Sequence, residues 1–154
     1  QLRKLDYIIG EQRKNKQVIK DALAQQVKGV GFRHLPDPAG DSATFLAFNL
    51  PDEDTAQRFQ NLLSAEGVDT VCFKRNSWHY VPNWEHFLAR STANSQKFPF
   101  TNPAYKGKVE YSRESIPRAE DILGRTLVMG IQVKMSPEKL GQITKGIEQA
   151  AGKM

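Results

Sequence analysis

Apolar residues recur at helical spacing over residues 1–27 and leave the charged residues on the opposite face. This pattern predicts a long N-terminal helix that ends near Gly29, a common helix-stop residue. Gln12 and Lys16 continue the same line, so polar side chains interrupt the stripe in mid-helix. The apolar positions that define the stripe are Leu2, Leu5, Ile9, Ile19 and Leu23.

Four other stretches favour β-structure. Residues 30–35 and 43–50 flank a turn-rich piece, residues 36–41, and predict a hairpin-like antiparallel pair. Residues 45–48 are apolar throughout, so we expect this strand to be covered on both faces. The apolar run 68–73 predicts a third strand, and residues 126–133 predict a fourth.

The remaining elements are helices and one long irregular stretch. Asp52, Glu53 and Asp54 open a helix that Gly67 closes, and Ser136 followed by Pro137 opens a final helix. Short helices are expected at 84–89 and 117–123, whereas residues 91–112 are expected to form an irregular loop, either mobile or functional. The predicted fold is α/β or α+β: a three- to four-stranded, mostly antiparallel sheet backed by helices, with a long N-terminal helix.

Composition and charge limit the classes of protein to which the chain can belong. With 154 residues, 39% of them hydrophobic, the chain can form one domain with a real core. We expect no membrane span, because no apolar run approaches about 20 residues. The lone Cys72 favours a reducing compartment, the cytoplasm. The net charge of +5 permits a nucleic-acid partner, but the basic residues are mixed with acids, so we expect none. The densest basic cluster, residues 13–16, is interpreted as a solvated helix face.

The chemistry-bearing stretch is the aromatic segment, residues 76–86, which contains both tryptophans, one tyrosine and two of the three histidines. Two interpretations remain open. It forms a ligand pocket at the end of a strand, or its rings plug the edge of a core. In the first case an anionic, polar ligand such as a sugar acid or phosphate is held, and in the second Lys74 and Arg75 are simply solvated. The residues offered to such a ligand are Lys74, Arg75, Asn76, Trp78, His79 and Tyr80.

Catalytic and metal motifs are weak. His79 and His86 are seven residues apart, which does not match the usual zinc spacings. Ser77 lacks the context of a nucleophile elbow, and the glycines at 29 and 31 precede a strand instead of opening a phosphate-binding helix. A catalytic lysine would need a dry pocket that lowers its pKa, and the sequence indicates none. The residues therefore indicate recognition and predict neither a metal nor a catalytic residue in this chain.

The chain nevertheless resembles a known family. Residues 1–6 and 12–15 resemble the helix that links the large and small domains of sugar aminotransferases, which are fold-type I enzymes dependent on pyridoxal phosphate. Residues 116–127 are similar to the stretch before that family's last strand, and residues 136–147 to its closing helix. Residues 13–16, 35–42, 78–80 and 83–84 resemble the 8-amino-3,8-dideoxyoctulosonate transaminase group most closely.

The resemblance implies a division of labour. Residues 1–28 would be the linking helix and residues 29–154 the C-terminal small domain. The absence of a helix cap before Leu2 agrees with a piece of a longer chain. The Schiff-base lysine and most of the residues that bind pyridoxal phosphate would belong to a large domain absent from this sequence. The full enzyme would be a homodimer that moves an amino group from an amino acid donor, expected to be glutamate, to a keto or aldehydo sugar. In the 8-amino-3,8-dideoxyoctulosonate transaminase group, the carbon that receives the amino group is C8 of an octulosonate used in lipopolysaccharide.

The resemblance also assigns roles. His79 and Tyr80 would lie near the sugar, with Trp78 and Asn76 beside them, and Arg125 would bind a substrate carboxylate or serve as a surface or interface arginine. The irregular stretch 91–112 would be a pocket lid or a dimer contact. The alternative is a free-standing, non-catalytic module that binds or regulates through the same fold.

Overall fold

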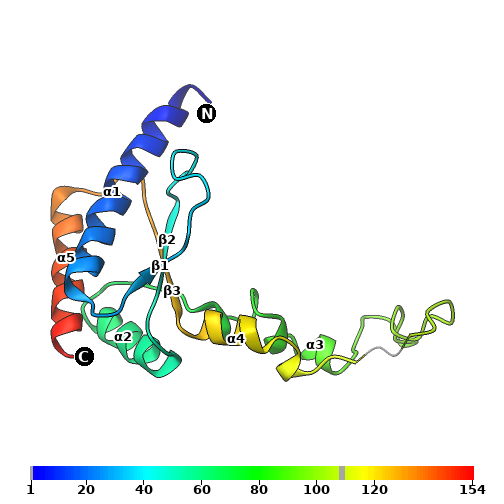
Figure 1. The fold of residues 1–154 in the computed structure, drawn as a ribbon. Coiled ribbons are helices and arrows are strands. Elements are labelled where there is room, and N and C mark those ends of the chain that lie inside the picture. Colours follow the sequence, from blue (N-terminus) through cyan, green and yellow to red (C-terminus); the bar gives the residue numbers. More distant parts are fainter. Residues whose placement is uncertain (1, 108–109) are drawn as a thin grey trace.

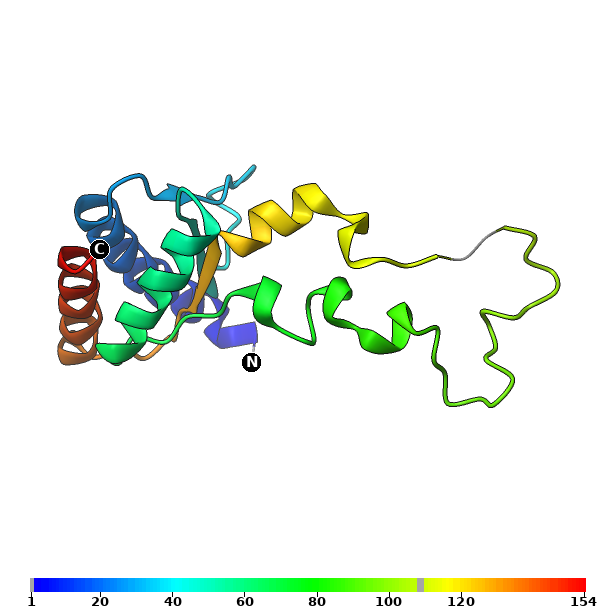
Figure 2. The same ribbon diagram turned by 90° about the horizontal axis from the view of Figure 1, so that it is seen from below.

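The computed structural model describes residues 2–107 and 110–154, which form a helix-backed sheet and a long projection from it (Figure 1). We call residues 2–72 and 125–154 the body, and residues 73–124 the arm. In Figure 2 the two legs of the arm leave the body side by side and are joined at the far end by irregular chain. The arm is therefore an insertion into a body that is built from both ends of the sequence.

The long N-terminal helix is confirmed as α1, Leu5–Gln26, which follows a short 3-10 turn at Leu2–Lys4. Ile19 and Leu23 on its apolar stripe are completely buried. The polar interruption has a structural explanation, because Gln12 and Asn15 are only 7% and 5% exposed. Gln12 donates through Nε2 to the carbonyl of Ile131 at 2.8 Å, and Asn15 donates through Nδ2 to the carbonyl of Gln132 at 2.9 Å. The two amides thus satisfy backbone carbonyls of the chain that follows the last strand.

The basic cluster at residues 13–16 is only in part the solvated face that the sequence suggested, because Arg13 and Lys14 are exposed whereas Asn15 is buried and Lys16 is partly buried. Arg13 donates to the backbone carbonyls of Ala39 and Asp41, and Lys16 forms a 2.5 Å ion pair with the Asp41 carboxylate. Burial alone would raise the pKa of Asp41, but the hydrogen bond from Lys16 and the backbone amide of Ala43 lower it below its ordinary value. The cluster therefore fastens the loop between the first two strands onto α1.

The sheet contains β1 (Gly31–Phe32), β2 (Phe45–Asn49) and β3 (Thr126–Gly130) in the order β1-β2-β3, and both pairings are antiparallel. The predicted hairpin and the antiparallel, helix-backed fold class are confirmed. The strand expected at residues 68–73 is reduced to one bridge, in which Val71 and Val128 exchange two backbone hydrogen bonds of 2.8 Å. Cys72 then leads into a 3-10 turn, so the ladder goes no further.

One face of the sheet is covered and the other is open. Leu46 and Phe48 of β2 are buried against the helices, whereas Phe45 on the opposite side is 37% exposed. On β3, Leu127 and Met129 share the buried face. The prediction that β2 is covered on both faces is therefore wrong, because the helices pack on one side only.

The covering layer consists of α1, α2 (Glu53–Ala65) and α5 (Pro137–Gly152), whose apolar residues join one core cluster with the sheet. Both later helices begin as predicted. The Asp52 carboxylate accepts a hydrogen bond from the Thr55 amide, and the Ser136 hydroxyl accepts one from the Lys139 amide. Phe59 of α2 packs edge-on against Phe48 of the sheet, with ring centroids 6.4 Å apart.

The arm contains short elements and little core. They are 3-10 turns at Phe73–Arg75, Val81–Asn83 and Arg113–Ser115, and the helices α3 (Glu85–Leu88) and α4 (Pro117–Gly124). Phe87 is the centre of a ring cluster with Trp84, His86, Phe100 and Tyr111. Residues 91–107 and 110–112 form no helix or strand, in agreement with the irregular loop expected there. No helix in the described ranges is long and apolar enough to cross a bilayer.

Candidate functional site

The aromatic segment lies at the base of the arm, where the chain leaves the body (Figure 1). It follows the 3-10 turn Phe73–Arg75 and contains the next one, Val81–Asn83. The Asn83 amide donates to the carbonyl of Lys74 at 2.8 Å and to that of Asn76 at 3.4 Å. Arg113 on the returning leg donates to the carbonyl of Pro82 at 2.7 Å. Side chains from both legs thus hold the backbone of the segment in place.

Asn76 organises the outer part of the segment. Its side-chain oxygen Oδ1 accepts hydrogen bonds from the backbone amides of Trp78 at 2.7 Å and His79 at 3.1 Å. The same oxygen lies 3.1 Å from Nδ1 of the His79 ring. One acceptor therefore contacts both a turn of backbone and the side chain of a predicted binding residue.

The predicted recognition side chains occupy different depths. Trp78 is 81% exposed and His79 is also exposed, with its ring 5.1 Å from that of Phe73. Tyr80 is only 3% exposed, and its hydroxyl has no hydrogen-bond partner within the described residues. Burial raises the pKa of the Tyr80 phenol, and the negative charge of Glu120 adds to this effect. Trp78 and His79 can meet a ligand directly, whereas Tyr80 is buried.

An ion cluster is centred on Lys74, just before the aromatic segment. Lys74 contacts the carboxylates of Glu53 on α2 at 2.6 Å and Glu120 on α4 at 3.1 Å. The hydrogen bond that Lys74 donates to the Glu53 carboxylate is the main reason that the pKa of Lys74 is raised, against the opposing effect of burial. Sequence reasoning did not identify this cluster, because its three members are far apart along the chain. The only indication was an acid in the first turn of each of the two helices.

Arg125 is placed apart from the outer residues of the aromatic segment. It follows α4, and its guanidinium Nε lies 3.4 Å from the Asp121 carboxylate one helical turn earlier. Its backbone carbonyl accepts a hydrogen bond from the Leu50 amide at 2.9 Å. The role predicted for Arg125, binding a substrate carboxylate, stays a prediction, and so do the sugar contacts predicted for the aromatic segment.

The two lysines in partly buried ion pairs do not fit the role of a Schiff-base lysine for pyridoxal phosphate. A Schiff-base lysine needs a pocket that favours its neutral amine. Lys16 and Lys74 are the lysines held in partly buried ion pairs, and each ammonium is stabilised by carboxylates. No group of three His, Cys, Asp or Glu side chains in the described ranges could hold a metal ion. What the segment can do is bind, with an exposed indole, an imidazole and an amide.

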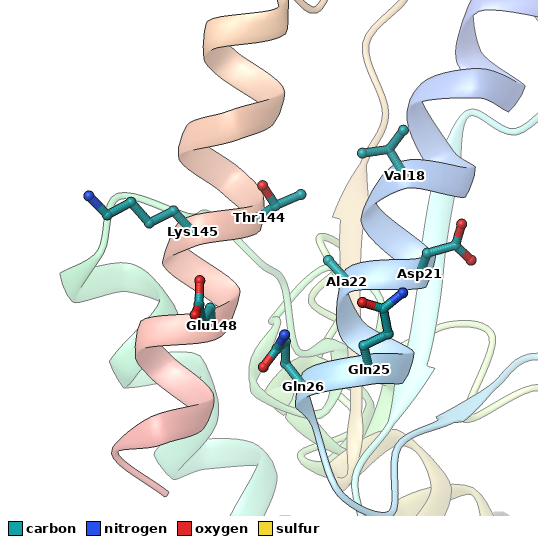
Figure 3. Close-up of a pocket in the computed structure, with 8 residues that line it drawn as sticks. All are labelled: Val18, Asp21, Ala22, Gln25, Gln26, Thr144, Lys145 and Glu148. Carbon is teal, nitrogen blue, oxygen red and sulfur yellow. The ribbon is translucent and has the colours of Figure 1, made fainter.

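A hollow lies elsewhere on the body, between α1 and α5 (Figure 3). It measures about 600 Å³ and is lined by α1 residues, including Val18 and Ala22, and by α5 residues, including Thr144 and Glu148. Figure 3 shows charged and amide side chains around its rim. This groove is formed by residues other than those of the aromatic segment, and no predicted site residue lines it.

Comparison with known proteins relates the fold to one enzyme class. No protein-family model matches the chain. Among solved structures, the chain is similar to the aminotransferase TlmJ from Streptoalloteichus hindustanus, with a TM-score of 0.63 and 16% sequence identity. The match covers 99% of this chain and 34% of that chain, so it spans about a third of the length of the solved protein. The chain therefore has the fold of a part of an aminotransferase.

Proposed function

We propose that this chain is the C-terminal small domain of a pyridoxal phosphate-dependent sugar aminotransferase. The observation that carries the proposal is the fold match to an aminotransferase over 99% of the chain, which leaves about two thirds of that enzyme unmatched. In this proposal residues 1–28 link to a large domain and residues 29–154 form the small domain. The resemblance in residues 78–80 and 83–84 directs the proposal to a sugar substrate.

The aromatic segment is the proposed sugar-binding part of the chain. The exposed indole of Trp78 offers a flat apolar face to a sugar ring, and His79 and Asn76 offer polar atoms to its hydroxyl groups. Tyr80 is buried, and its unpartnered hydroxyl is a further candidate to bind the sugar. Arg125 would have to exchange Asp121 for a substrate carboxylate, which is a simple exchange of one carboxylate partner for another.

The rest of the reaction is assigned to the large domain. The ion-paired lysines of this chain do not suit Schiff-base formation, so the cofactor is proposed to be held outside it. The proposed donor is glutamate. The proposed acceptor is a keto or aldehydo sugar, with C8 of an octulosonate for lipopolysaccharide as the specific candidate. The enzyme is proposed to act as a cytoplasmic homodimer, and the exposed rings of the arm, Phe98, Tyr105 and Tyr111, are candidate contacts to a second subunit or to the large domain.

The test compares this chain with a longer chain that includes the upstream lysine-bearing domain. Pyridoxal phosphate absorbance should show a Schiff-base band only in the longer chain, and glutamate should bleach it. A band on this chain alone would overturn the assignment of the catalytic lysine. No band on either chain would favour the alternative, a non-catalytic module of the same fold that binds or regulates.

Substrate contact is tested in the longer chain with Trp78→Ala. Loss of a stacked ring of this kind is worth about 1 kcal/mol, so the KM for the sugar should rise several-fold while the glutamate half-reaction is unchanged. Trp78→Phe is the matched control, since it keeps a flat apolar ring at the same exposed position and should raise the sugar KM less than Trp78→Ala does. An unchanged sugar KM in Trp78→Ala would refute the sugar-binding role of the segment.

A further inference from the structure

We propose that Asn76 is a positioning residue that holds the neutral His79 ring in the tautomer with its proton on Nδ1, so that Nε2 is presented to a ligand as a hydrogen-bond acceptor. The inference deepens the proposed function, on which the identity of the ligand rests. The tautomer itself follows from hydrogen bonds inside this chain.

The orientation of the Asn76 amide is determined by its backbone partners. Backbone amides can only donate, and those of Trp78 and His79 both point at the same side-chain atom of Asn76, at 2.7 and 3.1 Å. That atom must therefore be the oxygen Oδ1. The reverse orientation would place the two hydrogens of Nδ2 against two further donors, which is unfavourable.

The same oxygen then determines where the His79 proton lies. Nδ1 of the ring is 3.1 Å from Asn76 Oδ1, and an amide oxygen can only accept. Nδ1 must carry a hydrogen to bond with it, so in the neutral ring Nε2 carries none. This arrangement opposes the intrinsic preference of free histidine, whose neutral form favours the proton on Nε2.

The consequence concerns the ligand. The His79 ring is exposed and packed at 5.1 Å from Phe73, so its position is fixed while its outer edge is accessible to solvent. A fixed acceptor at Nε2 selects groups that donate, such as a sugar hydroxyl or an ammonium, over carbonyl or carboxylate oxygens. Asn76 contributes the complementary group: its oxygen is used internally, and its Nδ2, which makes no hydrogen bond among the residues that the structure describes, can donate to an acceptor on the ligand. The segment thus matches a ligand rich in hydroxyl groups.

Nuclear magnetic resonance of the imidazole nitrogens tests the proposal directly. The two-bond correlations between ring nitrogens and ring carbon-bound protons are recorded on the chain at a pH where its histidines are neutral. We expect Nδ1–H to be the major form of His79. His34 is an internal control, because it makes no hydrogen bond in the described part of the chain and should show the ordinary Nε2–H majority. An Nε2–H majority at His79 would overturn the proposal without any substitution.

Two substitutions separate positioning from simple structural support. Asn76→Asp keeps an oxygen acceptor for the same three donors, so the Nδ1–H form should persist. Asn76→Ala removes the acceptor, so the His79 tautomer ratio should move toward that of His34 while the rest of the spectrum is retained. An unchanged ratio in Asn76→Ala would show that Asn76 does not set the tautomer. If Nδ1–H is confirmed but the longer chain shows no transamination, the tautomer assignment stands and the proposed function fails.

Discussion

The buried amide of Gln12 provides a quantitative test of how α1 is held to the sheet. In Gln12→Met the side chain keeps its length and apolar stem but loses Nε2, the donor that lies 2.8 Å from the carbonyl of Ile131. Both residues are nearly inaccessible to water, at 7% and 4% exposure, so the carbonyl is left without its donor in an apolar setting. A buried polar group that loses its partner destabilises a protein by about 1–3 kcal/mol.

Urea unfolding followed by circular dichroism measures this effect. Since unfolding free energies fall by about 1–3 kcal/mol per molar urea in proteins of this size, the midpoint should drop by about 1 M with the slope unchanged. Gln17→Met is the matched control. Gln17 lies on the exposed side of the same helix, and its side chain donates to Asp21. In Gln17→Met the free energy of unfolding should therefore change by less than about 0.5 kcal/mol. Equal midpoints for the two variants would refute the structural role of the Gln12 hydrogen bond.

Three further outcomes are expected. In urea melts, Gly146→Ala should destabilise the chain by about 1–3 kcal/mol, because the added Cβ would lie 2.7 Å from a methyl carbon of Val68. Gly141→Ala on the same helix is the control: its Cβ would meet nothing within 4 Å, so it should stabilise the chain by about 0.5–1 kcal/mol. The pKa of Asp41 is lowered in the folded chain, so the stability that its carboxylate contributes is complete above about pH 4 and is lost as the pH falls through the folded-state pKa. Asp41→Asn should therefore make the free energy of unfolding depend less on pH in the acid range. An unchanged acid dependence would contradict this. Phe87→Ala should increase protease cleavage within the arm without shifting the unfolding midpoint of the body, whereas Phe98→Ala, which removes a largely exposed ring, should change neither.

The sequence predicted those elements whose determinants are local. The stripe of α1 and the Ser136 cap of α5 depend on neighbouring residues, and both elements begin and end within a few residues of the predictions. The strand expected at 68–73 was predicted from its apolar composition, but strand length depends on what lies alongside. Val71 finds a partner only at Val128, and the next residues turn away into the arm.

Side-chain roles were harder to read because they depend on residues distant in the sequence. In the sequence, Gln12 and Asn15 interrupt an apolar stripe. Their hydrogen bonds to the carbonyls of residues 131–133 could not be predicted, because these residues are distant along the chain. Lys16 looked solvated until Asp41 was brought to it by the loop. In the aromatic segment the exposed position of Trp78 and the burial of Tyr80 differ although both rings lie in the same short turn. No periodicity exists in such a turn from which depth could be inferred.

The insertion of the arm has a consequence for folding and for evolution. The body is assembled from two chain segments, and β2 can pair with β3 only after the entropy of closing the intervening loop has been overcome. Loop-closure entropy grows only with the logarithm of loop length, so halving the loop would change the folding free energy by about 0.6 kcal/mol. The length and sequence of the irregular part of the arm, residues 91–107 and 110–112, can therefore change with little effect on the body, whereas α4 is tied to α2 through Lys74. A protein built in this way can acquire new binding surfaces on its arm while the sheet and its helices stay the same.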